Sequence, residues 1–186
     1  YAGRLLYDKG VGEFVEAVER LRREGLPVAG ALLGFTDVAN PSAVSRETVD
    51  RWEVDGRIEY WGETDDVRPF LQRASCLVFP SYYSEGIPRC LLEAGSMAIP
   101  AITTDHVGCR DVVVDGETGY LVAPRDVTSL AEKMRAFVAL PDEEKLRMGE
   151  KARERVTSLF SEKQILAIYC REIARFVRSG TIGDPA

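Results

Sequence analysis

Two glutamates flank the beginning of a short apolar helix in the stretch SEGIPRCLLEAGSMAIP, which covers residues 84–100. Pro88 suits the first position of a helix, and Gly86 lets the backbone approach a ligand closely. A carboxylate can accept hydrogen bonds from the two adjacent hydroxyls of a ribose. With a rise of about 1.5 Å per residue, Glu93 lies on the order of 8 Å from the helix start. This spacing fits one ligand with its phosphates at the helix end and its ribose further along, and Glu85 would then face a hexose.

A basic turn near the beginning of the chain is the second candidate. In GRLLYDKG, residues 3–10, Arg4 and Lys9 bracket the turn from a predicted strand into a helix that Gly10 opens. Two cations and the unpaired N–H groups of a helix end make a good diphosphate site. The turn is neither a P-loop nor the dinucleotide fingerprint, because GxxxxGK[ST] and the third glycine are absent.

Both candidates have a purely structural alternative. Arg89 and Glu93 are spaced as an i,i+4 surface pair, and Glu85 favours the helix dipole. Arg4 and Lys9 can equally be two solvated residues at a domain edge. The residues alone leave these alternatives open.

The remaining polar residues favour no other chemistry. His106 is the only histidine, so no Ser-His-Asp or Cys-His arrangement is credible, and a lone loop histidine is typical of a surface. Asp65 and Asp66 could suggest a metal pair, but a helix cap explains Asp65 better. Tyr82 and Tyr83 could stack on a sugar or a base, or pack under a loop. We predict no metal site.

Composition indicates a globular protein with a real core. The 186 residues are 45% hydrophobic and 29% charged, and 24 cations against 30 anions give a net charge of −6. A nucleic acid or an anionic membrane is therefore not the expected main partner. Four scattered cysteines without a CxxC pair indicate reduced thiols in a cytoplasmic protein. The sequence has no apolar run long enough to span a membrane and no signal peptide. Its opening without methionine suggests a piece of a larger protein.

Short apolar runs alternate with helical periodicity, which predicts an α/β fold: a Rossmann-like parallel sheet with helices on both faces. The expected strands are 1–5, 28–35, 57–62, 75–81, 100–104 and one ending at 122. The expected helices are 10–25, one capped by Ser45, 65–74, one from Pro88, and a C-terminal extension of 126–139, 142–158 and 162–178. We predict one domain, 1–178, and a flexible tail, 179–186. Ligands of such sheets bind at the carboxyl ends of the strands.

GRLLYDKG, SEGIPRCLLEAGSMAIPAITTD and GCRDVVVDGETGYLVAP, in that order, resemble the carboxyl-terminal domain of group 1 glycosyltransferases. These are retaining enzymes of the GT-B architecture, which has two Rossmann domains. The resemblance covers about residues 1–178, and its most specific part is the E-x7-E pattern on Glu85 and Glu93. EGIPR, TTD and GCR are similar to the subset that acts on polyprenyl-diphosphate-linked sugars in surface polysaccharide and oligosaccharide assembly.

The resemblance implies that Arg4 and Lys9 hold the donor's diphosphate and offset the charge that grows on the departing nucleotide. Glu93 would bind the ribose hydroxyls. The implied donor is a UDP-sugar, with a GDP-sugar as the second option, and no metal or other cofactor is needed.

The resemblance further implies that Glu85 contacts the transferred sugar, helped by the backbone N–H groups of Gly86 and Ile87. Leu92 would lie near the ribose or the base. Helical spacing after Pro88 predicts a core stripe of Leu91, Ala94 and Ala98. At Ala98 this chain departs from the family, which usually has glycine there.

The acceptor, a glycan or a lipid-linked sugar, is expected to bind a separate amino-terminal domain. The full protein would then work in the cytoplasm, at the inner face of the cell membrane, through peripheral association. Helix 162–178 usually crosses onto that domain, so we expect an uncovered apolar patch of Ile165, Ile168, Tyr169 and Phe176. A nucleotide-sugar epimerase of related fold and a non-catalytic flavodoxin-like binding module are the alternative functions.

Overall fold

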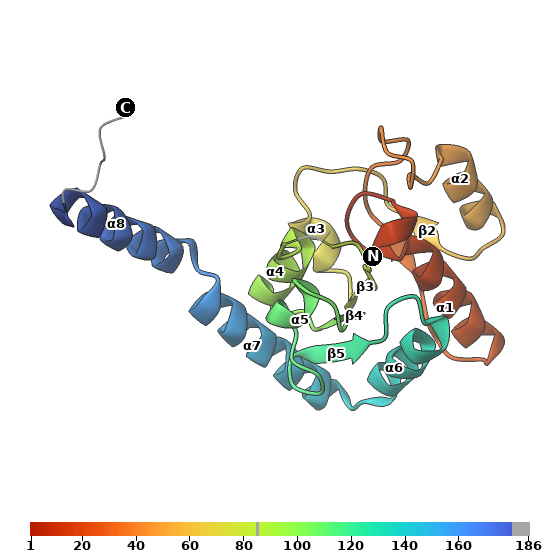
Figure 1. Ribbon diagram of the computed structural model, residues 1–186. Coiled ribbons are helices and arrows are strands. Elements are labelled where there is room, and N and C mark those ends of the chain that lie inside the picture. Colours follow the sequence, from red (N-terminus) through yellow and green to blue (C-terminus); the bar gives the residue numbers. More distant parts are fainter. Residues whose placement is uncertain (85, 180–186) are drawn as a thin grey trace.

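The computed structural model describes residues 1–84 and 86–179, and it is an α/β protein of parallel strands flanked by helices (Figure 1). The described elements, in chain order, are η1 (Tyr7–Lys9), α1 (Val11–Arg23), β1 (Ala31–Leu32), α2 (Arg46–Val54), β2 (Glu59–Tyr60), α3 (Arg68–Leu71), β3 (Leu77–Phe79), α4 (Arg89–Ser96), β4 (Ala101–Thr104), α5 (Cys109–Val112), β5 (Gly119–Val122), α6 (Val127–Ala139), α7 (Asp142–Leu159) and α8 (Glu162–Ser179).

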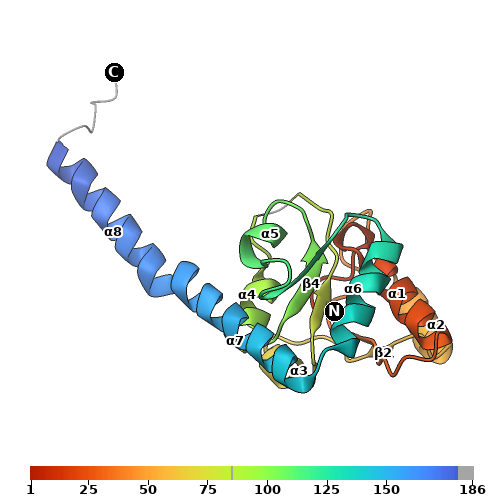
Figure 2. The ribbon, with the colours of Figure 1, turned by 90° about the horizontal axis from the view of Figure 1, so that it is seen from below.

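The strands form two parallel groups, β1-β2 and β3-β4-β5. In the larger group Leu77, Val78 and Phe79 pair with residues 101–103, and β5 continues beside β4. Helices α1 and α6 pack on one face of this group, and α4, α5 and α7 on the other (Figure 2). The predicted covering of a parallel sheet on both faces is confirmed.

Residues 1–5 run beside β1 as an extended segment. The N–H of Gly3 donates to the carbonyl oxygen of Leu33 at 2.9 Å, and that of Leu5 donates to Phe35 at 3.0 Å. Regular pairing is limited to a single parallel bridge, Ala2 with Leu33. The predicted strands at 1–5 and 28–35 are therefore longer than the paired stretches, because apolar runs continue into segments whose hydrogen bonds are irregular.

Helix α1 buries the apolar stripe that its 3.6-residue periodicity predicts. The stripe consists of Val11, Phe14, Val15, Val18 and Leu21, each at most 3% exposed. Full burial of one such side chain contributes about 1.5–3 kcal/mol, so this helix is a main part of the core under β3.

The predicted cap is present in one of two predicted helices, α2, and absent from α3, whose N-cap is Val67. The Ser45 side chain accepts the N–H of Thr48 at 3.2 Å at the start of α2, as predicted. The predicted helix 65–74 is wrong in extent, since α3 covers four residues. Asp66, rather than Asp65, accepts the N–H of Arg68, at 3.1 Å.

Helix α7 begins against α4 and β5, and its far end continues into α8, which projects away from the α/β body (Figures 1 and 2). The predicted apolar patch of α8 is exposed: Ile165, Ile168, Tyr169 and Phe176 have 41–65% of their surface accessible. Helix α8 reaches Ser179, one residue into the predicted tail, and residues 180–186 lie outside the described part of the chain. None of the described helices is both long and apolar enough to cross a membrane.

The turn between α4 and β4 corrects the expectation for Ala98. We expected Ala98 on the buried stripe of the helix with Leu91 and Ala94, but α4 ends at Ser96 and Ala98 lies beyond it with φ 59°. This left-handed conformation favours glycine, because a Cβ crowds the following carbonyl. The turn is held close to α7, since a Cβ added at Gly149 would overlap the Ala98 carbonyl oxygen.

Ala98→Gly is therefore expected to raise the free energy of unfolding by about 0.5–1 kcal/mol, because relief of the left-handed strain exceeds the entropy that glycine adds to the unfolded chain. Urea denaturation measures the change. Ala167→Gly on the exposed surface of α8 is the matched control and should lower stability by about 1 kcal/mol. A loss of stability in Ala98→Gly would contradict the assigned strain.

Candidate functional site

The basic turn is packed tightly against the end of β3. Gly10 has φ 77°, and a Cβ at this residue would overlap the carbonyl oxygen of Pro80. Lys9 is 8% exposed, with its Nζ 5.7 Å from the centre of the Phe79 ring. The N–H of Tyr82 donates to the carbonyl oxygen of Asp8 at 3.1 Å. The turn between residues 6 and 11 is thereby fixed at the carboxyl end of β3.

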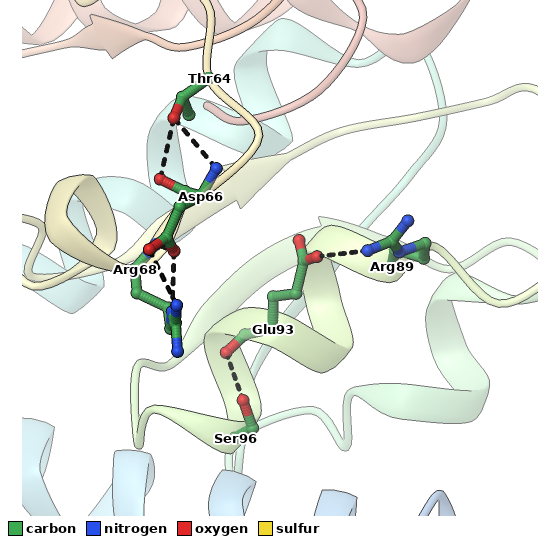
Figure 3. Close-up of polar contacts among 6 residues, drawn as sticks. All are labelled: Thr64, Asp66, Arg68, Arg89, Glu93 and Ser96. Atoms are coloured by element: carbon green, nitrogen blue, oxygen red, sulfur yellow. Dashed lines mark hydrogen bonds and ion pairs between the residues drawn. The ribbon is translucent and has the colours of Figure 1, made fainter. Parts of the chain in front are cut away.

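The polar face of helix α4 lies at the same carboxyl end of the strands as the basic turn. Pro88 is the N-cap and not the first helical residue, because its ψ of 123° is extended. Glu93 is about one-third exposed, and its Oε1 accepts a hydrogen bond from Nη2 of Arg89 at 3.2 Å. Ser96 Oγ donates to the backbone oxygen of Glu93 at 2.8 Å (Figure 3).

A pocket of about 480 Å³ joins the basic turn to this helix. Its polar lining includes Arg4, Lys9, Arg89, Asp65 and Glu93. The structure thus brings together three predicted side chains from segments some eighty residues apart. Of the other predicted residues, Ile87 also lines the pocket, whereas Gly86 is exposed and does not line it. Leu92 is partly buried and packs against the core. Glu85 lies outside the described residues. The roles assigned to these residues stay predictions.

The loop after β2 supplies further pocket residues, of which the sequence analysis named Asp65 but not Thr64 or Val67. Thr64, Asp65 and Val67 line the same pocket as Glu93. Thr64 Oγ1 both donates to the Asp66 carbonyl and accepts the Asp66 N–H, each at 3.0 Å, so the loop is rigidly folded (Figure 3). Its position after a strand was the available signal, but Asp65 was interpreted as a helix cap.

The pocket is cationic although the chain is acidic. Among the described residues that line it, three cations and two carboxylates give a formal charge of +1, against −6 for the whole chain. A phosphate group placed near Arg4 and Lys9 would meet these cations at close range. The lining therefore carries a local positive charge within a chain of negative net charge.

A second cavity, of about 330 Å³, opens at the amino-terminal ends of the strands. Mostly apolar side chains line it, including Phe14, Val18 and Met134, and none of the predicted site residues does. We assign the chemistry to the charged pocket, since it lies at the strand ends where ligands of such sheets bind.

The weaker candidates lie away from the charged pocket. His106 is half-buried in the loop after β4, with Nδ1 3.3 Å from the Val107 oxygen. Tyr82 lies under the guanidinium of Arg125, with Cζ 4.4 Å from the ring centre. Within the described part of the chain, no group of three or more His, Cys, Asp or Glu residues is placed to hold a metal ion.

Comparison with known proteins gives the family. The model for glycosyl transferases of group 1 matches residues 1–139, and the chain belongs to this family. The capsular polysaccharide biosynthesis glycosyltransferase CapM of Staphylococcus aureus is 28% identical over 167 residues, which are 89% of this chain and 42% of CapM. The N,N'-diacetylbacillosaminyl-diphospho-undecaprenol alpha-1,3-N-acetylgalactosaminyltransferase of Campylobacter jejuni is 31% identical over 146 residues, 78% of this chain and 36% of the relative.

The same fold occurs in Anabaena Alr3699/HepE, whose crystal structure contains UDP-glucose. The TM-score is 0.76 at 18% identity, and the match covers 96% of this chain and 48% of HepE. This chain is accordingly a glycosyltransferase domain with one half of the GT-B architecture, and it spans about two fifths of the length of the two curated relatives. The comparisons do not support the epimerase or the flavodoxin-like module.

The close contact at Gly10 gives a test of how the site is built. Gly10→Ala is expected to cost more than about 2 kcal/mol of stability, because the Pro80 backbone cannot move aside and the backbone is left-handed. Thermal and urea denaturation measure the loss. Gly25→Ala is the control: its φ is 82°, but no atom lies within 4 Å of its added Cβ, so only about 1 kcal/mol is lost. Equal losses would contradict the close packing.

Proposed function

We propose that this chain is the donor-binding domain of a retaining glycosyltransferase that uses a nucleotide-sugar. The observation that carries the proposal is the single pocket lined by Arg4, Lys9 and Glu93. The cations Arg4 and Lys9 suit the diphosphate of such a ligand, and the carboxylate of Glu93 on α4 suits its ribose. The crystal structure of HepE in complex with UDP-glucose supports the same ligand class.

The diphosphate would bind between Arg4 and Lys9. Arg4 is exposed and can adjust to the ligand, whereas Lys9 is buried with its Nζ over the Phe79 ring and offers a charge in a fixed place. When the bond from the anomeric carbon to the diphosphate oxygen breaks, its electron pair stays on that oxygen. The two cations stabilise this charge more in the transition state than in the bound donor, which is how they would accelerate the reaction.

The ribose would bind to Glu93. Its partner in the unliganded structure is Arg89, whose side chain is 89% exposed. Such exposed pairs contribute less than about 1 kcal/mol, so ribose hydroxyls can replace the guanidinium at little cost. The released Arg89 remains at the pocket wall.

The transferred sugar would lie toward Gly86 and Ile87, whose backbone N–H groups can donate to it, and toward Glu85. The side chain of Ile87 lines the pocket. The E-x7-E resemblance supports these assignments and the retaining course of the reaction. Leu92 would act indirectly, by packing the helix that carries Glu93.

The donor base and the acceptor are assigned by chemical class. We propose a UDP-sugar first and a GDP-sugar second, and an acceptor that is a glycan or a polyprenyl-diphosphate-linked sugar. The two relatives, a glycosyltransferase of capsular polysaccharide biosynthesis and a diphospho-undecaprenol N-acetylgalactosaminyltransferase, support this class. Such an acceptor would bring the complete protein to the cytoplasmic face of a membrane.

Binding of UDP and UDP-glucose tests the donor site directly. Lys9→Met keeps the packed stem but removes the charge, and Glu93→Gln removes the charged acceptor. Each is expected to weaken binding about tenfold or more, because hydrogen bonds to charged groups contribute about 1.5–3 kcal/mol. Isothermal titration calorimetry measures the affinity.

Glu47→Gln is the matched control for Glu93→Gln. Glu47 pairs with Arg51 at 3.1 Å in the same i,i+4 manner, on α2 and outside the pocket lining. Both variants should melt within a degree or two of the wild type, since exposed pairs contribute little, but only Glu93→Gln should lose affinity. Equal affinity for UDP in both variants would refute the role of Glu93.

We expect the chain by itself to bind the donor without transferring its sugar, because the resemblance assigns the acceptor site to another domain. The measurement is UDP release from UDP-glucose and UDP-N-acetylglucosamine with a polyprenyl-diphosphate-linked sugar as acceptor. Turnover above the blank that disappears in Glu93→Gln would overturn this expectation.

A further inference from the structure

A strained arginine outside the pocket contacts the loop that leads into it. Arg125 lies in the turn between β5 and α6 with φ 60°. Arginine in this left-handed conformation is unfavourable, and such outliers persist where other contacts hold them. Asp126, the next residue, caps α6 by accepting the N–H of Ser129 at 3.0 Å, so the turn is held on its C-terminal side.

The side chain of Arg125 reaches across to the β3–α4 loop. Its Cζ lies 4.4 Å from the ring centre of Tyr82, which is a close cation–π contact. Glu13 of α1 belongs to the same cluster: burial raises its pKa, and Arg125 opposes that rise. Burial also raises the pKa of Tyr82, and the nearby negative charge of Glu13 raises it further.

The loop is anchored at its beginning and then continues to the pocket. Tyr82 is bound by its N–H to Asp8, next to Lys9, and the buried Ser81 accepts a hydrogen bond from the Thr104 hydroxyl. Beyond Tyr82, the N–H of Tyr83 donates to Ser81 Oγ at 3.4 Å, Ser84 and Gly86 are exposed, and Ile87 lines the pocket. The ring of Tyr82 is thus one of the fixed points that precede the pocket residues of this loop.

We propose that Arg125 is a positioning residue for the donor site, which acts by holding Tyr82 and hence the loop that carries Gly86 and Ile87. The inference rests on the proposed function. Arg125 itself does not line the pocket, so its effect would pass through the loop. Its strained backbone is maintained because the turn aims the guanidinium at the ring.

Arg125→Gly separates positioning from folding. Glycine relaxes the left-handed backbone and removes the guanidinium, so the melting temperature should stay the same or rise while the loop loosens. We expect the dissociation constant for UDP-glucose to increase about two- to fivefold, the factor that corresponds to an exposed cation–π contact. Amide hydrogen exchange at residues 82–84 should become faster.

Three variants serve as comparisons. Ala98→Gly relaxes a left-handed residue in a turn away from the pocket and should leave the affinity unchanged. Tyr82→Leu should reproduce the loss seen in Arg125→Gly, and Tyr82→Phe, which keeps the ring, should restore most of the affinity. Combining Arg125→Gly with Tyr82→Leu should weaken binding no further than either alone, because both remove one contact.

The outcomes distinguish this inference from the proposed function. If the wild-type chain binds neither UDP nor UDP-glucose, the proposed function fails, and hydrogen exchange alone decides whether Arg125 fixes the loop. If Arg125→Gly leaves both the affinity and the exchange of residues 82–84 unchanged, Arg125 is not a positioning residue.

Discussion

The carbonyl oxygen of Pro80 leaves no space for a side chain at residue 10, and this contact joins the two halves of the pocket. Because residue 10 is glycine, the basic turn packs directly against the end of β3, and the chain continues from this end of β3 to α4. Lys9 is buried at that junction, and Glu93 lies one helix further along. Because parallel strands end at one edge of the sheet, a cationic turn and an acidic helix distant in sequence share one pocket.

The charges of the pocket differ in how firmly they are held, and this difference suits a ligand that must arrive and leave. Lys9 is fixed by burial, whereas Arg4 and Arg89 are exposed. Glu93 forms a surface pair with Arg89, which ribose hydroxyls would replace in the proposed function. The loop between β3 and α4 is anchored at Ser81 and Tyr82, and Ser84, Gly86 and Ile87 are exposed. In the proposed function this anchoring would set where the backbone of Gly86 and Ile87 meets the sugar.

Much of the fold could be predicted because periodicity and capping are local signals. The stripe of α1, the Ser45 cap and the alternation of strands with helices followed from residue spacing, and the strand-end rule then selected the pocket loops. The α4–β4 turn could not be predicted, since the apolar pattern continues through Ala98 and alanine carries no signal for a left-handed backbone. The contact of Arg125 with Tyr82 could not be predicted either, because it depends on how two loops that are distant in sequence meet in space.

Calorimetry with a matched set of ligands and variants tests most directly whether Lys9 and Glu93 hold different parts of one donor. UDP, UMP and 2′,3′-dideoxy-UDP would be titrated into the wild-type chain, Lys9→Met and Glu93→Gln. The account predicts that Lys9→Met abolishes the preference for UDP over UMP and keeps the preference for ribose, while Glu93→Gln does the reverse. Equal losses for every ligand in both variants would contradict it, because neither side chain would then recognise its own part of the donor.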